Sequence, residues 1–335
     1  MRIFIATGIF PPEIGGPAQY ALNLRDIWEK NGHQVSVKVF SKWNQFPTGL
    51  RHFLYFLSIL HDVVRADFVL ILDTYSCALP TTMACRLFRK KMILRTGGDF
   101  VWEAYIERTG DLVTLPQFYK TRVPKLSFKE RFIFSLTKSI LNSVDAVIWS
   151  TEWQKNIFTE PYELQKQKHF VVENYYGPRF PSQSYTKKNF VAFSRKLKLK
   201  HIDFLKKIFN RSDVIHSGAV LDTGTVEKGH FLENLKNSYA VIVASLSDIS
   251  PNVILDAIRC QKPFILTKEN GLYDRVGEIG LFVDPMDEED VARKVIWLSN
   301  EVNYQNQKKK IELFSLVHTW EDIASEYINV YNQIK

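Results

Sequence analysis

The sequence predicts an α/β protein built from two parallel-sheet units, and three observations support this. The 335 residues are too many for one ordinary core and suit two domains. The chain opens as a short apolar strand, a glycine-containing loop, an amphipathic helix and a second strand, which is how a parallel sheet begins. A similar alternation resumes after a polar stretch with prolines and lysines at 171–189, the best linker candidate.

In the first half, residues 2–7 predict a strand and residues 8–17 a loop. A helix over 18–32 is expected to carry one apolar face and to end at a glycine; the face comprises Tyr20, Leu22, Leu24, Ile27 and Trp28. The remaining elements expected there are a strand at 33–40, a helix within 49–65 feeding a buried strand at 66–72, strands at 90–95 and 145–151, and a long helix at 128–144.

In the second half, strands and helices follow each other closely. The segments are 190–195, 200–209, 213–220, 229–238, 239–245, 251–260, 262–267, 281–284 and 288–300. An amphipathic helix at 319–335 needs a surface to lie on. The predicted division is a first domain over 1–178, a second over 179–318, and the terminal helix from 319.

Composition narrows the class of protein. Hydrophobic residues make up 45%, which is typical of a packed globular protein. Three separated cysteines without a CxxC pair argue against a disulfide framework or a zinc site and favour a reducing, cytoplasmic compartment. The N-terminus does not read as a secretory signal, and no apolar run reaches spanning length. The net charge of +8 indicates an anionic partner without choosing between nucleic acid, an anionic membrane and a phosphorylated substrate.

Gly15 and Gly16 stand immediately before Pro17, a residue suited to the first turn of a helix. Glycines let a backbone approach a ligand, and the start of a helix offers N–H groups to an anion. A plain strand-to-helix turn would look the same. The dinucleotide signature GxGxxG is absent.

A basic run, "SRKLKLK", contains Arg195 and Lys200. If Arg195 ends a strand and Lys200 begins the next helix, both side chains can bind one diphosphate, arginine as a fork and lysine as a point charge. Spacing alone equally fits a solvated basic face.

The stretch "SDISPNVILDA" combines a helix start with two acids. Ser250 is a natural N-cap and Pro251 a natural first helical residue, so the positive end of the helix should lie at the carboxyl edge of strand 239–245. Asp248 falls in the loop and Asp256 within the helix. Phosphate suits the helix start and hydroxyls suit the acids, a combination that fits a nucleotide sugar. Asp256 could instead form only a salt bridge.

Two further stretches have open interpretations. Asp99, after "RTGG", would lie at a sheet edge, where it could accept a hydroxyl, act as a base or make an Asx-type turn. The aromatic and basic stretch 118–136 could lie on an anionic membrane or be a core helix with a wet basic face.

Together these motifs resemble the retaining glycosyltransferases of the GT-B type, in particular family GT4, nearly end to end. The resemblance rests on the following stretches: "GIFPPEIGGPAQYALNLRDIWEKNGHQVSV", "RTGGDFVWEAYIERTG", "VVENYYGP", the Arg195–Lys200 spacing, "SDISPNVILDAIRCQKPFILTKENGL" and "TWEDIASEYINVY". The resemblance implies two Rossmann-like domains with a cleft between them and a terminal helix that crosses back to the first domain.

The resemblance also implies roles for individual residues. Arg195 and Lys200 would hold the diphosphate, Asp248 the transferred sugar and Asp256 the ribose, with Asp99 orienting the acceptor. Against the phosphate, sugar and base would lie Gly15, Gly16, Gly218, Ser250, Pro251 and Asn252. Both acids are aspartates where the family more often has glutamate, which shortens each by about 1.5 Å.

The expected activity is metal-independent, retaining transfer from a nucleotide-diphosphate sugar to a glycan or lipid-linked glycan, with no cofactor. No nucleic acid is expected as partner, and contact with an anionic membrane at its inner face is a further expectation. A non-catalytic protein that binds sugar nucleotides or glycans on the same fold is the main alternative. A nicotinamide-dependent dehydrogenase is disfavoured by the missing glycine signature.

Overall fold

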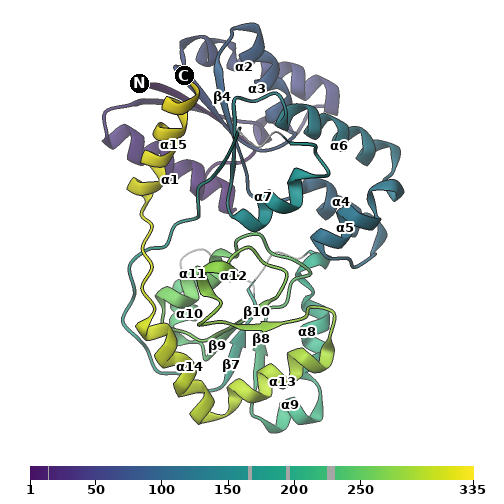
Figure 1. Cartoon of the computed structure of the whole chain (residues 1–335), viewed down its shortest axis with the longest axis vertical. Helices are drawn as coiled ribbons and strands as arrows, with labels where there is room; N and C mark the ends of the chain where they lie inside the picture. Colours follow the sequence, from purple (N-terminus) through teal and green to yellow (C-terminus); the bar gives the residue numbers. More distant parts are fainter. Residues whose placement is uncertain (14, 165–167, 194–196, 225–230) are drawn as a thin grey trace. The chain divides into compact units, whose positions relative to one another are not determined.

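The chain forms two compact α/β units in a computed structural model that describes residues 1–13, 15–164, 168–193, 197–224 and 231–335 (Figure 1). Unit 1 comprises Met1–Val101, Val123–Tyr175 and His318–Lys335. Unit 2 comprises Trp102–Arg122 and Tyr176–Val317. The chain crosses between the units four times, and the crossings after Tyr175 and Val317 lie close to the boundaries expected at 178 and 318. The assignment of Trp102–Arg122 to unit 2 differs from the expected division.

The sheet of unit 1 has six parallel strands in the order β2-β1-β3-β4-β5-β6. They are β1 (Arg2–Thr7), β2 (Gln34–Val39), β3 (Phe68–Leu72), β4 (Lys91–Thr96), β5 (Ala146–Trp149) and β6 (His169–Val171). Every residue of β3 is buried, as expected for a central parallel strand with helices over both faces.

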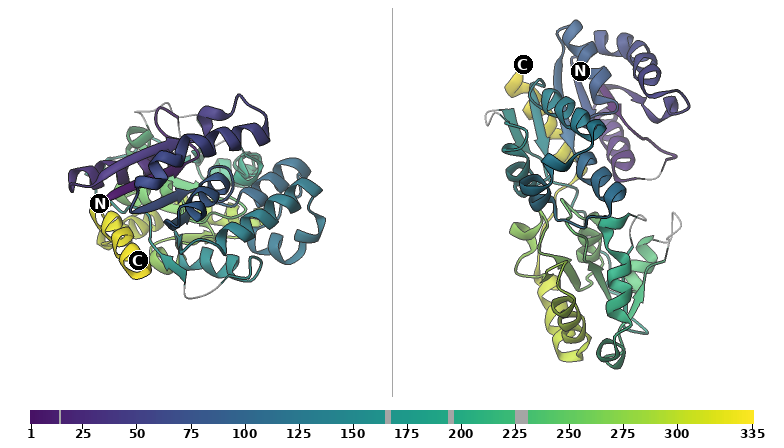
Figure 2. Two further views of the ribbon diagram at one scale, coloured as in Figure 1. Left: turned by 90° about the horizontal axis from the view of Figure 1, so that it is seen from above. Right: turned by 90° about the vertical axis from the view of Figure 1, so that its right-hand side faces the viewer.

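One face of this sheet is covered by α1 (Gly16–Lys30) and the terminal helix α15 (Trp320–Ile334). The buried hydroxyls of Tyr20 and Tyr327 are 3.0 Å apart, and Trp28 Nε1 donates to the carbonyl of Ala324 at 3.1 Å. The left view of Figure 2 shows the yellow terminal helix beside the purple N-terminal part. The prediction that this helix returns to the first domain is therefore confirmed.

The other helices of unit 1 include α2 (Thr48–Arg65), α3 (Ala78–Leu87), α6 (Phe128–Leu141) and α7 (Glu152–Thr159), with short 3₁₀ turns η1 (Ser41–Trp43) and η2 (Val123–Lys125). α2 packs on α3, and α3 packs on α6. α6 begins at a capping box, in which Ser127 and Glu130 satisfy each other's backbone N–H groups. None of the described helices is long and apolar enough to cross a membrane.

The sheet of unit 2 has five parallel strands in the order β11-β10-β9-β7-β8. They are β7 (Asn189–Val191), β8 (Val220–Asp222), β9 (Ala240–Val243), β10 (Phe264–Thr267) and β11 (Leu281–Val283). The helical segments are η4 (Lys198–Lys200), α8 (Ile202–Phe209), α9 (Ser212–His216), α10 (Phe231–Asn237), α11 (Asn252–Arg259), α12 (Tyr273–Val276), α13 (Glu288–Ser299) and α14 (Glu301–Leu313). Two parallel-sheet α/β domains are thus confirmed.

The segment Trp102–Arg122 carries most of α4 (Phe100–Thr109) and all of α5 (Leu115–Thr121). The backbone N–H of Leu115 donates to the buried hydroxyl of Ser247 at 2.9 Å. The carboxylate of Glu107 accepts the backbone N–H of Lys198 at 2.7 Å, and its carbonyl accepts Lys198 Nζ at 2.8 Å. These bonds tie the segment to the loops that carry the candidate donor residues.

Candidate functional site

Two sequence-predicted residues meet at the carboxyl edge of the sheet in unit 2. Lys200 ends η4, which follows β7, and Asp248 lies in the loop after β9. Because β7 and β9 are parallel neighbours, both residues emerge at the edge where ligands of open α/β sheets bind. Lys200 Nζ donates to Asp248 Oδ2 at 2.6 Å, and the two side chains are only 19% and 15% exposed.

The backbone fixes this pair from both sides. The N–H of Asp248 donates to the carbonyl of Glu269 at 2.9 Å, and its own carbonyl accepts the N–H of Gly271 at 3.2 Å. On the other side, the N–H of Leu246 donates to the carbonyl of Leu199 at 2.9 Å. The ion pair therefore belongs to a braced edge, and its partial burial makes the charges interact more strongly than at an open surface.

α11 begins beside Asp248, one residue later than expected. Pro251 is the N-cap, the helix starts at Asn252, and no side chain caps it, so the prediction that Ser250 is the N-cap is wrong. The extended backbone of Pro251 (ψ 101°) places it just outside the helix. The positive end of the helix dipole still lies at this edge, where it favours an anion.

Asp256 lies just over one turn into α11 and forms a salt bridge within that helix. Arg259 Nη1 donates to Asp256 Oδ1 at 2.8 Å, and the two side chains are mostly buried. Burial raises the pKa of Asp256, and Arg259 opposes that shift. Asp256 thus forms the salt bridge that the sequence left open as an alternative. The guanidinium of Arg259 also lies over the ring of Phe180, 4.6 Å from its centroid.

Two further predicted donor residues are not brought to this edge by the described structure. Arg195 lies outside the described residues. Gly218 precedes β8 and adopts φ +79°, next to Lys188, whose Nζ donates to the carbonyl of Ser217 at 3.2 Å. The amino end of a strand lies at the opposite edge from Asp248, so the expectation that Gly218 faces a donor base is not supported by its position.

In unit 1, the predicted residues also gather at the carboxyl edge of the sheet. Gly15 is the N-cap of α1, where an added Cβ would stand 2.6 Å from Ile9 Cδ1, and Gly16 is the first helical residue. Asp99, which follows β4, is 4% exposed. Sequence reasoning missed Asp73, which directly follows the intervening strand β3. Burial raises the pKa of Asp73, and the backbone N–H of Ser76 donates to its Oδ1 at 2.8 Å.

Glu269 is a second residue that the sequence analysis missed. It follows β10, and its carbonyl holds the backbone of Asp248. Burial raises the pKa of Glu269, Asp284 adds to the shift, and Lys120 on α5 opposes it. The sequence contained a signal for Glu269, because it is an acid two residues after a buried strand.

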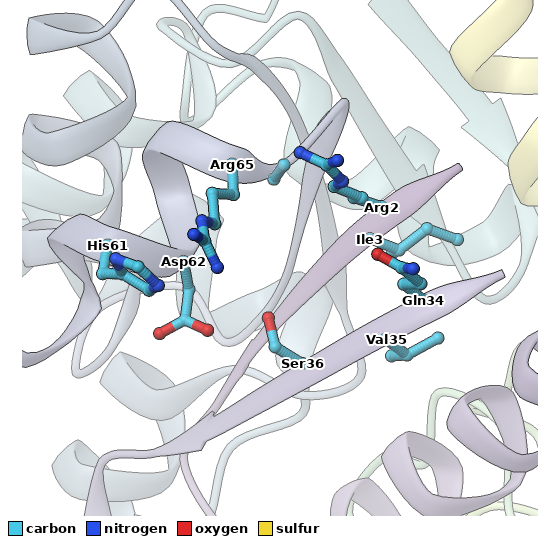
Figure 3. A pocket seen from close by; sticks show the side chains of 9 residues that line it. Arg2, Ile3, Gln34, Val35, Ser36, His61, Asp62 and Arg65 are labelled. Carbon is cyan, nitrogen blue, oxygen red and sulfur yellow. The ribbon is translucent and has the colours of Figure 1, made fainter.

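A groove with a volume of about 180 Å³ lies at the other edge of the sheet in unit 1. Figure 3 shows His61, Asp62 and Arg65 from α2 on one side, and Arg2, Gln34 and Ser36 from the starts of β1 and β2 on the other. Because these strand starts are opposite the ends that lead to Gly15 and Asp99, the groove is separate from the predicted site. Among the described residues, no group of His, Cys, Asp or Glu has the geometry of a metal site.

Residues 201–301 match the family model described as "Glycosyl transferases group 1". This range contains Asp248, Asp256 and the start of α11, and Lys200 adjoins it. The chain thus has the GT-B fold, and its residues 201–301 resemble the group 1 glycosyltransferases. No curated protein matches the sequence.

Several solved structures share the fold of this chain along its whole length. Sucrose-phosphate synthase from Thermosynechococcus elongatus is 12% identical with a TM-score of 0.67, and the match covers 100% of this chain and 99% of that one. The catalytic domain of starch synthase IV from Arabidopsis thaliana, bound to ADP and acarbose, is 10% identical with a TM-score of 0.66, covering 99% of both chains. HepE from Anabaena, in complex with UDP, is 12% identical with a TM-score of 0.63, covering 100% and 98%.

Proposed function

We propose that this chain is a glycosyltransferase of family GT4 that moves a sugar from a nucleotide-diphosphate sugar to a glycan or lipid-linked glycan, with retention of configuration and without a metal ion. The observation that carries the proposal is the braced Lys200–Asp248 pair at the carboxyl edge of unit 2, beside the uncapped start of α11. The family match over the adjoining residues supports it.

Donor binding exchanges the partner of Lys200. A diphosphate at this edge offers a higher charge than one carboxylate, so the ammonium group turns from Asp248 Oδ2 to the phosphate oxygens. Asp248 is then free to accept hydrogen bonds from hydroxyls of the transferred sugar. Binding of the correct donor thus prepares the cation and the acid in one step.

Bond cleavage places negative charge on the leaving diphosphate. Lys200 and the positive end of α11 stabilise that charge, and Arg195 is proposed as the second cation on the basis of its spacing. The bond from the sugar's anomeric carbon to phosphate breaks, the bond to the acceptor oxygen forms on the same face, and the acceptor proton passes to the leaving phosphate oxygen. Asp99 in unit 1 orients the acceptor hydroxyl.

The acceptor is assigned by charge. With a net charge of +8, the chain favours an anionic or phosphate-bearing acceptor, such as a glycan on a lipid diphosphate. A protein that binds sugar nucleotides without turnover is the second candidate. The observation that favours it is the Asp256–Arg259 salt bridge, which occupies the acid expected to hold the ribose.

A donor screen tests the proposal. Thermal shift and slow sugar release would be measured with UDP-, GDP-, ADP- and dTDP-sugars in EDTA, since a ligand that binds the folded state raises the melting temperature. Arg195→Ala and the charge-neutral pair Lys200→Met with Asp248→Asn should abolish the shift. Lys206→Met, which changes an exposed lysine of α8, is the control.

Each outcome of the screen distinguishes the transferase from the binding protein or excludes both. A shift for one nucleotide class with sugar release in EDTA supports metal-independent transfer and names the donor. A shift without release, persisting when candidate acceptors are added, selects the binding protein. No shift with any nucleotide sugar removes both.

A further inference from the structure

Helix α2 carries apolar side chains on two opposite faces. Its inner face, formed by Tyr55, Ile59 and Val63, is completely buried. Its outer face carries four apolar side chains at helical spacing, each 45–58% exposed. They are Leu50, Phe53, Leu57 and Val64. An ordinary surface helix would have polar residues there, so this outer stripe requires an explanation.

The neighbouring helix α3 extends the apolar surface. Met83 and Leu87, one turn apart, are 56% and 64% exposed, and Phe88 directly after the helix is 37% exposed. Since α2 packs on α3, the two stripes belong to one part of unit 1, which we call the α2–α3 face. It holds seven of the twenty large apolar side chains that are exposed in the described part of the chain.

The charges around this face are almost all positive. No Asp or Glu occurs in residues 41–61 or 74–98. Arg86 and Arg89 border the apolar side chains of α3, and Arg65 lies at the end of α2. Across the described ranges, the side chains of Arg65 and Arg86 have no acidic partner within salt-bridge distance.

The groove of Figure 3 adds a second feature at the end of the stripe. It is flanked by Arg2, His61 and Arg65, and its one acid, Asp62, faces Lys38 at 3.5 Å. A cationic groove of about 180 Å³ next to exposed apolar side chains has room for one phosphate group.

We propose that the α2–α3 face docks onto a bilayer that contains anionic phospholipid. The outer residues of α2 and α3 enter the boundary between headgroups and acyl chains, and the arginines contact lipid phosphates, with one headgroup held in the groove. A second copy of the chain fits poorly, because pairing this face with itself would bring two cationic rims together. The inference does not depend on the proposed transfer reaction, because attachment can be measured without turnover.

The first test is co-sedimentation of the full chain with vesicles of phosphatidylcholine, with and without phosphatidylglycerol. Binding should require the anionic lipid. The double variant Phe53→Ser, Leu57→Ser should bind about tenfold or more weakly, since each position loses apolar burial in the bilayer. Reversing Arg65→Glu with Arg86→Glu should weaken it by about fivefold per charge.

Matched controls lie on α14 in unit 2. Val302 and Leu313 are 68% and 76% exposed, so Val302→Ser with Leu313→Ser removes comparable apolar surface elsewhere. The exposed pair Lys309→Glu with Lys310→Glu reverses two charges there. Both control variants should bind vesicles like the unchanged protein.

A second measurement locates the contact directly. The three native cysteines are buried, so Leu57→Cys or Val302→Cys introduces an exposed thiol for an environment-sensitive dye. Emission from position 57 should shift to the blue with anionic vesicles, and emission from position 302 should not.

Three results would overturn the proposal. The first is equal binding to neutral and anionic vesicles, and the second is no blue shift at position 57. The third is loss of binding in the double variant Phe128→Ser, Phe132→Ser while the α2 double variant still binds. The last result would move the contact to α6, whose Phe128 and Phe132 are 89% and 55% exposed.

Discussion

Lys200 and Asp248 each neutralise the other at 2.6 Å, so changing either one alone leaves a partly buried charge. We predict that Lys200→Met lowers kcat/KM for the donor by about 10²–10³, because a charge aimed at the leaving group is lost. Steady-state kinetics of sugar transfer measures this. Lys206→Met should leave the rate unchanged, and an equal loss in both variants would contradict the role of Lys200.

Arg89 gives a prediction about stability. It has φ +52° directly after the C-cap of α3, and the N–H of Lys90 donates to the carbonyl of Cys85, the pattern in which glycine is usual. Arg89→Gly should raise the free energy of unfolding by about 0.5–1 kcal/mol because the strain is relieved. Urea unfolding measures it.

The control for Arg89 is one turn back. Arg86→Gly, inside the same helix, should lower the free energy of unfolding by about 1 kcal/mol. If Arg89→Gly is destabilising to the same degree, the left-handed backbone at this position is not strained.

At single positions, sequence reasoning worked where the backbone leaves one choice. Strand ends and a Pro-Asn helix start placed Lys200 and Asp248 at one edge, and the structure pairs them. For Gly218 the role at a donor base stays a prediction, since a glycine with positive φ ends a helix as readily as it lines a ligand site. The Asp256–Arg259 salt bridge was an open alternative, since an acid and an arginine three apart on a helix always lie within reach.

At the level of elements, one of the polar bonds that hold α5 within unit 2 joins Leu115 to Ser247. Ser247→Ala removes the acceptor for the buried N–H of Leu115. We predict a loss of about 1–3 kcal/mol in the free energy of unfolding and faster tryptic cleavage within residues 120–125, because an unpaired buried N–H favours release of the segment.

The control for this prediction is Ser238→Ala in the same unit. That buried hydroxyl donates only to the carbonyl of Leu235 at the end of α10, far along the chain from α5. Its cleavage pattern should not change. Faster cleavage in both variants would mean that unit 2 loosens as a whole.

The contact between helices α1 and α15 can be tested by a double-mutant cycle. Tyr327→Phe leaves the buried hydroxyl of Tyr20 without this partner and should cost about 1–2 kcal/mol in the free energy of unfolding. Tyr20→Phe combined with Tyr327→Phe should cost less than the sum of the single changes, since neither hydroxyl is then left without the other. Additive losses in denaturant unfolding would show that the two hydroxyls do not interact.

Periodicity predicted most elements but not the partner of every element. The helix at the C-terminal end was matched to unit 1 through the resemblance, and the structure confirms it. The segment Trp102–Arg122 was expected in the first domain because of its place in the chain. One of the bonds that hold it to unit 2 spans 132 residues, from Leu115 to Ser247, and no local pattern encodes such a distance.

For the whole molecule, pH acts where the chain re-enters unit 1. His318 Nε2 lies 3.1 Å from Glu326 Oε1, and Nδ1 lies 3.1 Å from the carbonyl of Asn174, just before the other crossing. The hydrogen bond to Glu326 raises the pKa of His318 above 6.5, although burial lowers it. A raised pKa means that this contribution to stability is complete below pH 6.5 and is lost as pH rises through the folded value.

We therefore predict that the free energy of unfolding is higher at about pH 6 than at about pH 8.5, and that Glu326→Gln reduces the difference. Chemical denaturation at both values measures it. An unchanged difference in Glu326→Gln would assign the pH dependence to other groups.

The fold class could be predicted from the order of strands and helices because that order restricts a parallel sheet to few topologies. The sequence could not predict how the candidate donor residues pair, since pairing depends on loop backbones such as the bond from Asp248 to Glu269. The apolar stripe of α2 was hidden for a different reason. A helix that is apolar on two faces resembles a fully buried one in sequence.

The return of α15 to unit 1 also affects the order in which the two units can fold during synthesis on the ribosome. The core between α1 and the sheet includes Ile323, Tyr327 and Val330, which are made after all of unit 2. All residues of unit 2 have been synthesised once the chain has passed Val317, shortly after α14. The half that is synthesised first therefore finishes folding last, and a premature stop codon just before α15 would spare the candidate donor residues and expose Tyr20 and Trp28.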